Sequence, residues 1–336
     1  MLEQEEPARV DCYRAGPGGL ESIARSEAAE LIKCAPVTLE TKKELPLVWI
    51  DILNPAEKEA VFLRNELGMH PLAVEDCVRG RQRPKIDRYP GYFFLVFYST
   101  RINLERRRMA LNEIHLFLGS SFLITVHDQE VPELRSVIET WKQRAQRNDD
   151  SGTAAHALLD AIVDNYFPVT EHFSNRLESL EDEIFTSAPS TTLQSAIHLR
   201  QEMLLLRRVL APERDVLSSL VRRDLPFVRP ELVPYFADVH DHVLRVTEEI
   251  DSFRDLISTL LEVQSSNAAN QLNQTMRTLA GWSIILMSMA LIAGIYGMNF
   301  DYMPELHTQW GYFGALLLMA AIGGALLAVF RKREWL

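Results

Sequence analysis

The sequence predicts an α/β domain that is followed by a long helical region and two C-terminal transmembrane helices. Strand-like and helical runs alternate up to about residue 150, and the pattern after that point is helical throughout. Residues 278–300 and 310–330 contain no charged side chain. Each of these runs reaches the roughly 20 residues that a helix needs to cross a bilayer.

The composition is that of a globular protein with an acidic body. The 336 residues are 47% hydrophobic and 24% charged, and 46 acids against 35 bases give a formal net charge of −11. Residues 278–336 hold as many acids as bases, so the whole excess belongs to residues 1–277. Such a body disfavours nucleic acid as a partner and suits a domain that works among cations. The three cysteines are far apart, and their spacing predicts no zinc site.

The α/β domain is expected over residues 47–150. Residues 1–46 give little structural signal apart from a loop at Pro17-Gly18-Gly19. Alternating and β-branched runs predict strands over 47–51, 92–98, 113–118 and 122–127, the last two joined as a hairpin. Capping and proline signals predict helices over 54–68 and 131–146.

The rest of the chain is predicted to be helical. We expect one helix over 153–185 and a second over 191–223, which Pro212 should kink. Between Pro234 and Gly281 there is neither proline nor glycine, so a single helix should run from Tyr235 to Met298 and measure about 95 Å. The resulting segments are cytoplasmic helices over 151–233, a stalk over 234–277, spans over 278–298 and 310–330, a loop over 299–309 and a tail over 331–336.

Charges at the ends of the two spans predict their orientation. Arg277 precedes the first span and Arg331 to Arg333 follow the second, and basic residues near a span tend to stay cytoplasmic. The loop between the spans holds Asp301 and Glu305 but no lysine or arginine. We therefore expect both termini in the cytoplasm and the loop outside. The acidic N-terminus lacks the apolar core of a signal peptide.

One face of the first span carries small, polar or methionine side chains. Asn273, Ala280, Met287 and Gly294 recur every seven residues, and Met276, Ser283 and Ala290 fall midway between them. Two interpretations are open at this point. Small residues let membrane helices pack closely, or the face lines a pore. The second interpretation requires several subunits around an axis, since two spans per chain cannot enclose a pore.

The end of the first span carries a specific motif. Gly297-Met298-Asn299 is followed by Met303-Pro304-Glu305-Leu306, and the basic tail ends in Trp335-Leu336. With these residues in a two-span C-terminal hairpin, the chain resembles the CorA magnesium channels. Residues 70–76, 82–85 and 235–242 extend the likeness, which covers roughly residues 47–336. One departure is Ser288, where many relatives have a proline after the position of Met287.

The resemblance implies a funnel-shaped homopentamer that lets Mg²⁺ enter passively through a prokaryotic inner membrane, with lipid around its spans. Co²⁺ and Ni²⁺ are further candidate ions. Mg²⁺ sheds water reluctantly, so we expect a ring of Asn299 amides to accept hydrogen bonds from the hydrated ion, with the carbonyls of Gly297 and Met298 behind it. Asp301 and Glu305 either concentrate cations at the outer mouth or are merely solvated there.

The resemblance also implies a gate and a regulatory site. Met276, Leu279 and Met287 align with the narrow apolar part of the pore, and Asn273 with a polar ring at its cytoplasmic end. Ser283, Ala290 and Gly294 would complete the pore lining. Asp76 and Asp238 match carboxylates that bind Mg²⁺ between neighbouring cytoplasmic domains, where a bound cation would bridge acidic faces and keep the channel closed.

Two other function classes are weighed against this one. A proton-coupled carrier for Co²⁺, Ni²⁺ or Zn²⁺ would favour ionisable ligands within the spans, and residues 278–300 and 310–330 contain none. A membrane-anchored enzyme would favour a nucleophile elbow, a phosphate-binding loop or a ligand cluster, and the sequence shows no such motif. We assign no chemistry to the histidines, because His240 and His242 do not share a helical face.

Overall fold

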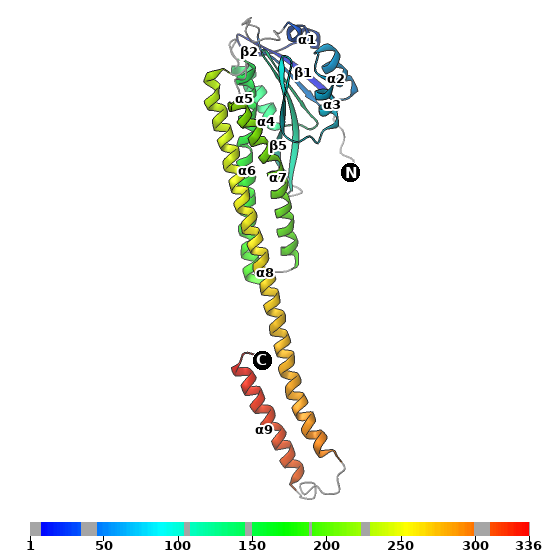
Figure 1. Cartoon of the computed structure of the whole chain (residues 1–336), viewed down its shortest axis with the longest axis vertical. Coiled ribbons are helices and arrows are strands. Elements are labelled where there is room, and N and C mark those ends of the chain that lie inside the picture. The colour runs from blue at the N-terminus through cyan, green and yellow to red at the C-terminus, as the bar shows by residue number, and fades with distance from the viewer. Residues whose placement is uncertain are drawn as a thin grey trace. The chain divides into compact units, whose positions relative to one another are not determined.

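The computed structural model describes residues 8–34, 46–103, 108–144, 150–187, 190–222, 229–298 and 310–335. The chain divides into two compact units, residues 1–258 and residues 259–336. Figure 1 labels the elements of both. The predicted class, an α/β domain with a long helix and two C-terminal helices long and apolar enough to cross a membrane, is confirmed.

A seven-stranded sheet organises the first unit, with strand order β2-β1-β3-β7-β6-β5-β4. Among the described strands, β3 and β7 alone pair in parallel, and the other neighbours are antiparallel. Every residue of β3 and β7 is buried, as expected for strands inside a covered sheet. The strands are β1 (Arg9–Gly16), β2 (Gly19–Ser22), β3 (Val48–Leu53), β4 (Lys85–Tyr89), β5 (Tyr92–Asn103), β6 (Arg108–Gly119) and β7 (Phe122–His127).

Helices cover both faces of the sheet. Ile50 of β3 joins a hydrophobic cluster with residues of α1 (Arg25–Lys33), α2 (Glu57–Val61) and α3 (Pro71–Arg79). The next residue toward the N-terminus, Trp49, points to the other face, since side chains alternate along a strand. There its ring meets Trp141 of α4 (Pro132–Arg144) edge to face, with centroids 6.0 Å apart. The core therefore lies on both sides of the central strands.

The N-terminal segment, which carries little structural signal in the sequence, contributes two strands to this sheet. β1 and β2 form a hairpin, and β1 pairs with β3 from Arg9↔Leu53 to Arg14↔Val48. Charged side chains at Arg9, Asp11 and Arg14 interrupt the apolar residues of β1 and conceal the strand in the sequence. The helix expected over 54–68 is also different: α2 leads into a π-helical turn, Phe62–Glu66, before Gly68 at a φ of 72°.

The predicted helix over 153–185 is two helices. α5 (Ser151–Asp164) and α6 (Tyr166–Ser187) meet at Asn165, whose Nδ2 donates to the carbonyl of Thr100 at 2.6 Å. Pro168, the third residue of α6, lacks the N–H that would bond to the Asp164 carbonyl, and its ring clashes with that carbonyl. The break therefore has a signal in the sequence that the prediction over 153–185 missed, and the contact to β5 holds Asn165 in place. α7 (Ser190–Arg222) contains Pro212 and beside it Glu213, which is fully buried.

The long helix is continuous. After a 3₁₀ turn at Pro230–Leu232, α8 extends over Val233–Tyr296, 64 residues, within two residues of the predicted bounds at each end. α9 covers Gly311–Lys332. The predicted second span, 310–330, lies almost wholly within α9.

Candidate ion pathway and cation site

In the second unit, α9 packs against one face of α8. Gly281 and Ile285 are buried there, and Met289 lies on the same face one turn further along. A Cβ added to Gly323 of α9 would come within 2.5 Å of the Met289 methyl, so the small residue allows a close approach. Thr278 Oγ1 donates to the carbonyl of Trp335 at 2.9 Å, and this bond ties the chain after α9 to α8.

The predicted pore residues lie on the opposite face of α8. At 100° per residue, Met276 and Met287 lie about 160–180° around the helix from Ile285, and Leu279 about 120°. Their exposed fractions are 61% for Met276, 64% for Leu279 and 70% for Met287. Four further residues of this stripe are also exposed, namely Asn273, Ser283, Ala290 and Gly294. The whole predicted stripe is therefore left uncovered by α9.

Exposure alone does not separate a pore-lining residue from one that faces lipid. Leu286 and Leu291 are 63% and 65% exposed, yet neither belongs to the predicted lining. The stripe differs in chemistry, since it combines an amide, a hydroxyl and small side chains. Ser283 Oγ donates to the carbonyl of Leu279 at 2.8 Å, which leaves the lone pairs of its oxygen free for another donor.

Ser288, the departure from the related sequences, does not interrupt the helix. Its hydroxyl donates to the carbonyl of Ile285 at 2.8 Å, and α8 continues to Tyr296. A serine that bonds back to its own helix can bend it slightly, whereas proline would also remove a backbone donor.

The first two residues of the predicted filter directly follow the end of α8 at Tyr296. Gly297 N–H donates to the carbonyl of Ala293 at 2.9 Å, and a Cβ at Gly297 would lie 3.2 Å from that oxygen. A side chain would therefore be tight at this position. Met298 is 48% exposed. Asn299, Asp301 and Glu305 lie outside the described residues.

Asp76, the first predicted regulatory carboxylate, lies on α3 and is paired with a lysine. Lys85 Nζ is 2.8 Å from Asp76 Oδ2 and 2.8 Å from Asp87 Oδ2. Burial lowers the pKa of Lys85, but the hydrogen bonds to the two carboxylates outweigh it, so the pKa lies above the ordinary lysine value. The ammonium is therefore a fixed positive charge beside Asp76.

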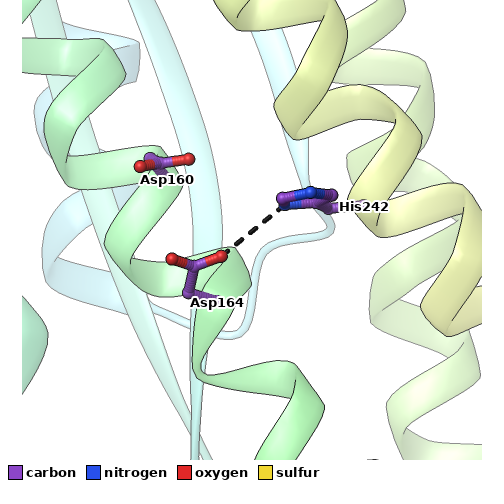
Figure 2. Close-up of side chains that lie close together, drawn as sticks. All are labelled: Asp160, Asp164 and His242. Atoms are coloured by element: carbon purple, nitrogen blue, oxygen red, sulfur yellow. Dashed lines mark ion pairs between the residues drawn. The ribbon is translucent and has the colours of Figure 1, made fainter.

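Asp238, the second predicted carboxylate, lies on α8 within a small cluster of ligand-type side chains. His242 Nε2 is 3.9 Å from Asp238 Oδ2, and His242 Nδ1 is 3.6 Å from Asp164 Oδ1 on α5. Figure 2 shows His242 of α8 directed toward Asp164 of α5, and Asp160 lies one turn from Asp164 on α5. One ligand atom from each of Asp160, Asp164 and His242 lies within 4.8 Å of the others.

The cluster is partly screened from water. Burial raises the pKa of the Asp160 carboxyl, and the negative charge of Asp164 adds to the rise against the opposing effect of His156. The two carboxylates and the imidazole of Asp160, Asp164 and His242 fit a hydrated divalent cation, since Mg²⁺ binds through one or two carboxylates and keeps several waters. The imidazole is also a ligand for Co²⁺, Ni²⁺ or Zn²⁺.

Sequence reasoning missed Asp160, Asp164 and His242. The four-residue spacing of the two aspartates puts them on one face of a helix, which is the one signal available. The spacing does not show that this face meets α8, and His242 has no ligand-type neighbour at helical spacing other than Asp238. The partner of His242 comes from another helix, 78 residues earlier in the chain.

Comparison with known proteins identifies the family. The profile of the CorA-like Mg²⁺ transporter proteins matches residues 45–332. The chain belongs to the CorA family. It is 34% identical to YfjQ of Bacillus subtilis, over 91% of the chain and 95% of that protein. The cobalt/magnesium transport protein CorA of Thermotoga maritima is 32% identical, over 86% of the chain and 83% of that protein.

The fold is likewise that of CorA. The complete structure of the CorA magnesium transporter from Methanocaldococcus jannaschii superposes with a TM-score of 0.81 at 21% identity, over 97% of this chain and 98% of that one. The protein is therefore a CorA-family membrane transporter of divalent cations with two candidate membrane-spanning helices. The family is one of transporters rather than of enzymes.

Proposed function

We propose that this CorA-family protein is a channel through which Mg²⁺ enters the cell passively, and that cytoplasmic Mg²⁺ closes it. The uncovered stripe of α8 is the observation that carries the proposal. It has no charged side chain between Thr278 and Met298 and leads directly to Gly297. An uncharged path suits an ion that keeps its water, because the lining then exchanges hydrogen bonds with that water rather than stripping it away.

Selection takes place at Gly297, Met298 and Asn299 in this account. Asn299 supplies amide oxygens that accept hydrogen bonds from the hydration shell of the ion. The carbonyls of Gly297 and Met298 add further acceptors. Asp301 and Glu305 raise the cation concentration at the outer mouth.

The channel requires several copies of the chain. Two helices cannot surround a pore, so the uncovered stripes of neighbouring copies face a common axis, with five subunits as in the family resemblance. Met276, Leu279 and Met287 then form apolar rings that exclude water when the pore is narrow. The basic tail remains in the cytoplasm and the loop between the spans outside, in a prokaryotic inner membrane.

Regulation rests on Asp76 and Asp238 of neighbouring subunits. Divalent cations between them hold the acidic domains together, and without the ions the domains repel by up to ~4 kcal/mol for two charges 4 Å apart at an effective dielectric of 20. A site filled at tenfold above its dissociation constant contributes about 1.4 kcal/mol. Five such sites exceed the ~5.5 kcal/mol that moves a gate from 1:99 to 99:1. The cluster of Asp164 and His242 beside Asp238 supports a cation there.

A second candidate is a Co²⁺, Ni²⁺ or Zn²⁺ transporter of the same fold. The imidazole of His242 favours it as a sensor of such ions, and the relative from T. maritima is named for cobalt as well as magnesium. The two candidates differ in the transported ion.

Flux of the four ions into liposomes that contain the purified full-length protein separates the candidates. We expect Mg²⁺ uptake without a proton gradient, and slower uptake of Zn²⁺. Uptake of Zn²⁺ or Co²⁺ in the absence of any Mg²⁺ uptake would contradict a magnesium channel.

A further inference from the structure

The ammonium of Lys85 pairs with Asp76, the proposed regulatory carboxylate, within the same subunit. Lys85 is the first residue of β4, the edge strand of the sheet, and its side chain reaches across to α3. Its ammonium lies 2.8 Å from both Asp76 and Asp87, and 5.6 Å from the centre of the Phe94 ring. Two carboxylates and an aromatic face thus hold one cation at the position where the metal would bind.

We propose that Lys85 is a built-in competitor of the divalent cation at Asp76, and that it sets the Mg²⁺ concentration at which the channel closes. This inference rests on the proposed regulatory role of Asp76. Without metal, the ammonium pairs with Asp76 and offsets part of the repulsion between the acidic domains. With metal, Lys85 leaves Asp76 and keeps its pair with Asp87.

The geometry explains why both ions cannot share Asp76. A magnesium ion coordinated by this carboxylate lies about 2.0–2.1 Å from its oxygen, and the ammonium is already 2.8 Å from Oδ2. Two cations so close repel each other strongly. A resident lysine therefore makes divalent binding weaker than the carboxylate alone would give.

Asp87 makes the exchange possible. It lies two residues after Lys85 on the same strand, so both side chains point to the same face of the sheet. Lys85 Nζ also lies 2.8 Å from Asp87 Oδ2, so the ammonium keeps one carboxylate partner when it leaves Asp76. If Asp87 were absent, Lys85 would remain on Asp76 and oppose the metal more strongly.

A structural role for Lys85 predicts something different. A partly exposed ion pair between α3 and β4 stabilises the fold by about 0–1 kcal/mol. Its loss would lower stability slightly, and the Mg²⁺ concentration for closure would not change.

The test is the Mg²⁺ midpoint of protease protection in the full-length protein, measured for Lys85→Met and a matched control. Methionine keeps the apolar stem over Phe94 and removes the charge. We expect the midpoint to fall about three- to tenfold. The control is Lys142→Met, because Lys142 also pairs with a carboxylate (Glu139, 2.7 Å) and lies 5.1 Å from an aromatic ring (Tyr13). Its midpoint should equal that of the wild type.

Asp87→Asn should shift the Mg²⁺ midpoint in the opposite direction. The substitution removes the alternative partner of Lys85, which then stays on Asp76, so the midpoint should rise in the wild-type background. It should not change in Lys85→Met, where no ammonium is present. The inference is overturned if Lys85→Met leaves the midpoint unchanged, or if Asp87→Asn acts equally without Lys85. Lys85→Gln replaces Lys85→Met if methionine disturbs the fold.

Asp76→Ala separates this inference from the proposed function. If it leaves the Mg²⁺ midpoint unchanged, the regulatory role of Asp76 is wrong and the inference falls with it. If it raises the midpoint and Lys85→Met does not lower it, only the competitor role is wrong.

Discussion

Glu213 of α7 is a carboxyl group enclosed by protein on every side. Its Oε1 accepts the Tyr98 backbone N–H at 2.8 Å, and its Oε2 lies 2.8 Å from the Tyr166 hydroxyl, which is also 2.5 Å from the carbonyl of Tyr98. The single phenolic proton cannot serve two acceptors. A protonated Glu213 completes the network by donating to Tyr166, which donates to Tyr98. Burial raises the pKa of Glu213 well above its ordinary value, in agreement with this arrangement.

Protonation of Glu213 makes the stability of the fold depend on pH. A carboxyl whose pKa is raised on folding stabilises the fold below its unfolded pKa of about 4.3, and this contribution is lost as pH rises toward the folded value. Glu213→Gln keeps one acceptor and one donor, so we expect it to unfold at an equal or higher temperature than the wild type at pH 8, with a gain that shrinks toward pH 5. Unfolding temperatures of both proteins between pH 5 and pH 8 test this expectation. The control is Glu178→Gln, at an exposed position of α6. A variant that is less stable at pH 8 would show that Glu213 is ionised in the fold.

Asn299 is the residue on which ion selection depends in this account. Asn299→Ala removes the amide acceptors that the proposal assigns to the filter, so we expect at least a tenfold loss of Mg²⁺ uptake in a fully assembled oligomer. Size-exclusion chromatography and liposome flux measure the two properties. Asn175→Ala, on the exposed side of α6, is the matched control. Normal uptake by the assembled Asn299 variant would rule out the filter assignment.

Among the helices and strands, α8 could be predicted from the sequence and the N-terminal hairpin could not. A helix of 64 residues is visible because glycine and proline are absent between Pro234 and Gly281. β1 is hidden by its charged residues. The α5–α6 break does have a local signal, Pro168 in the first turn of α6, and the hydrogen bond from Asn165 to Thr100 adds a tertiary contact there. The Asp164–His242 contact could not be predicted, because tertiary packing brings the two helices together.

The uncovered face of α8 predicts a gate at Leu279 and Met287. Neither side chain has an oxygen ligand, so they should block the ion by size and by excluding water rather than by binding it. Leu279→Ala and Met287→Ala should therefore leave a residual flux at internal Mg²⁺ concentrations that close the wild type. Leu317→Ala on α9, at a site 74% exposed but on another helix, is the control. Reduced flux at every Mg²⁺ concentration would reassign both positions to helix packing.

In the assembled channel, substitutions at Asp76 and Asp238 separate regulation from permeation. Alanine at both positions removes the bound cation and also part of the repulsion that opens the empty channel. We expect the double variant to lose the Mg²⁺ dependence of closure and of protease protection, with little gain in maximal flux. Limited proteolysis from micromolar to tens of millimolar Mg²⁺ tests this. Unchanged protection would place the regulatory ions elsewhere on the acidic body.

A passive channel closed by Mg²⁺ is distinguished from a proton-coupled carrier by Mg²⁺ entry into liposomes, followed with a luminal indicator while the Mg²⁺ concentration on the side of the soluble unit is varied. We expect uptake down the Mg²⁺ gradient without any proton gradient, and a steep decline of that uptake as Mg²⁺ at the soluble unit rises into the millimolar range. Uptake that requires a proton gradient, or that does not respond to Mg²⁺ on that side, would contradict a passive channel closed by its own ion.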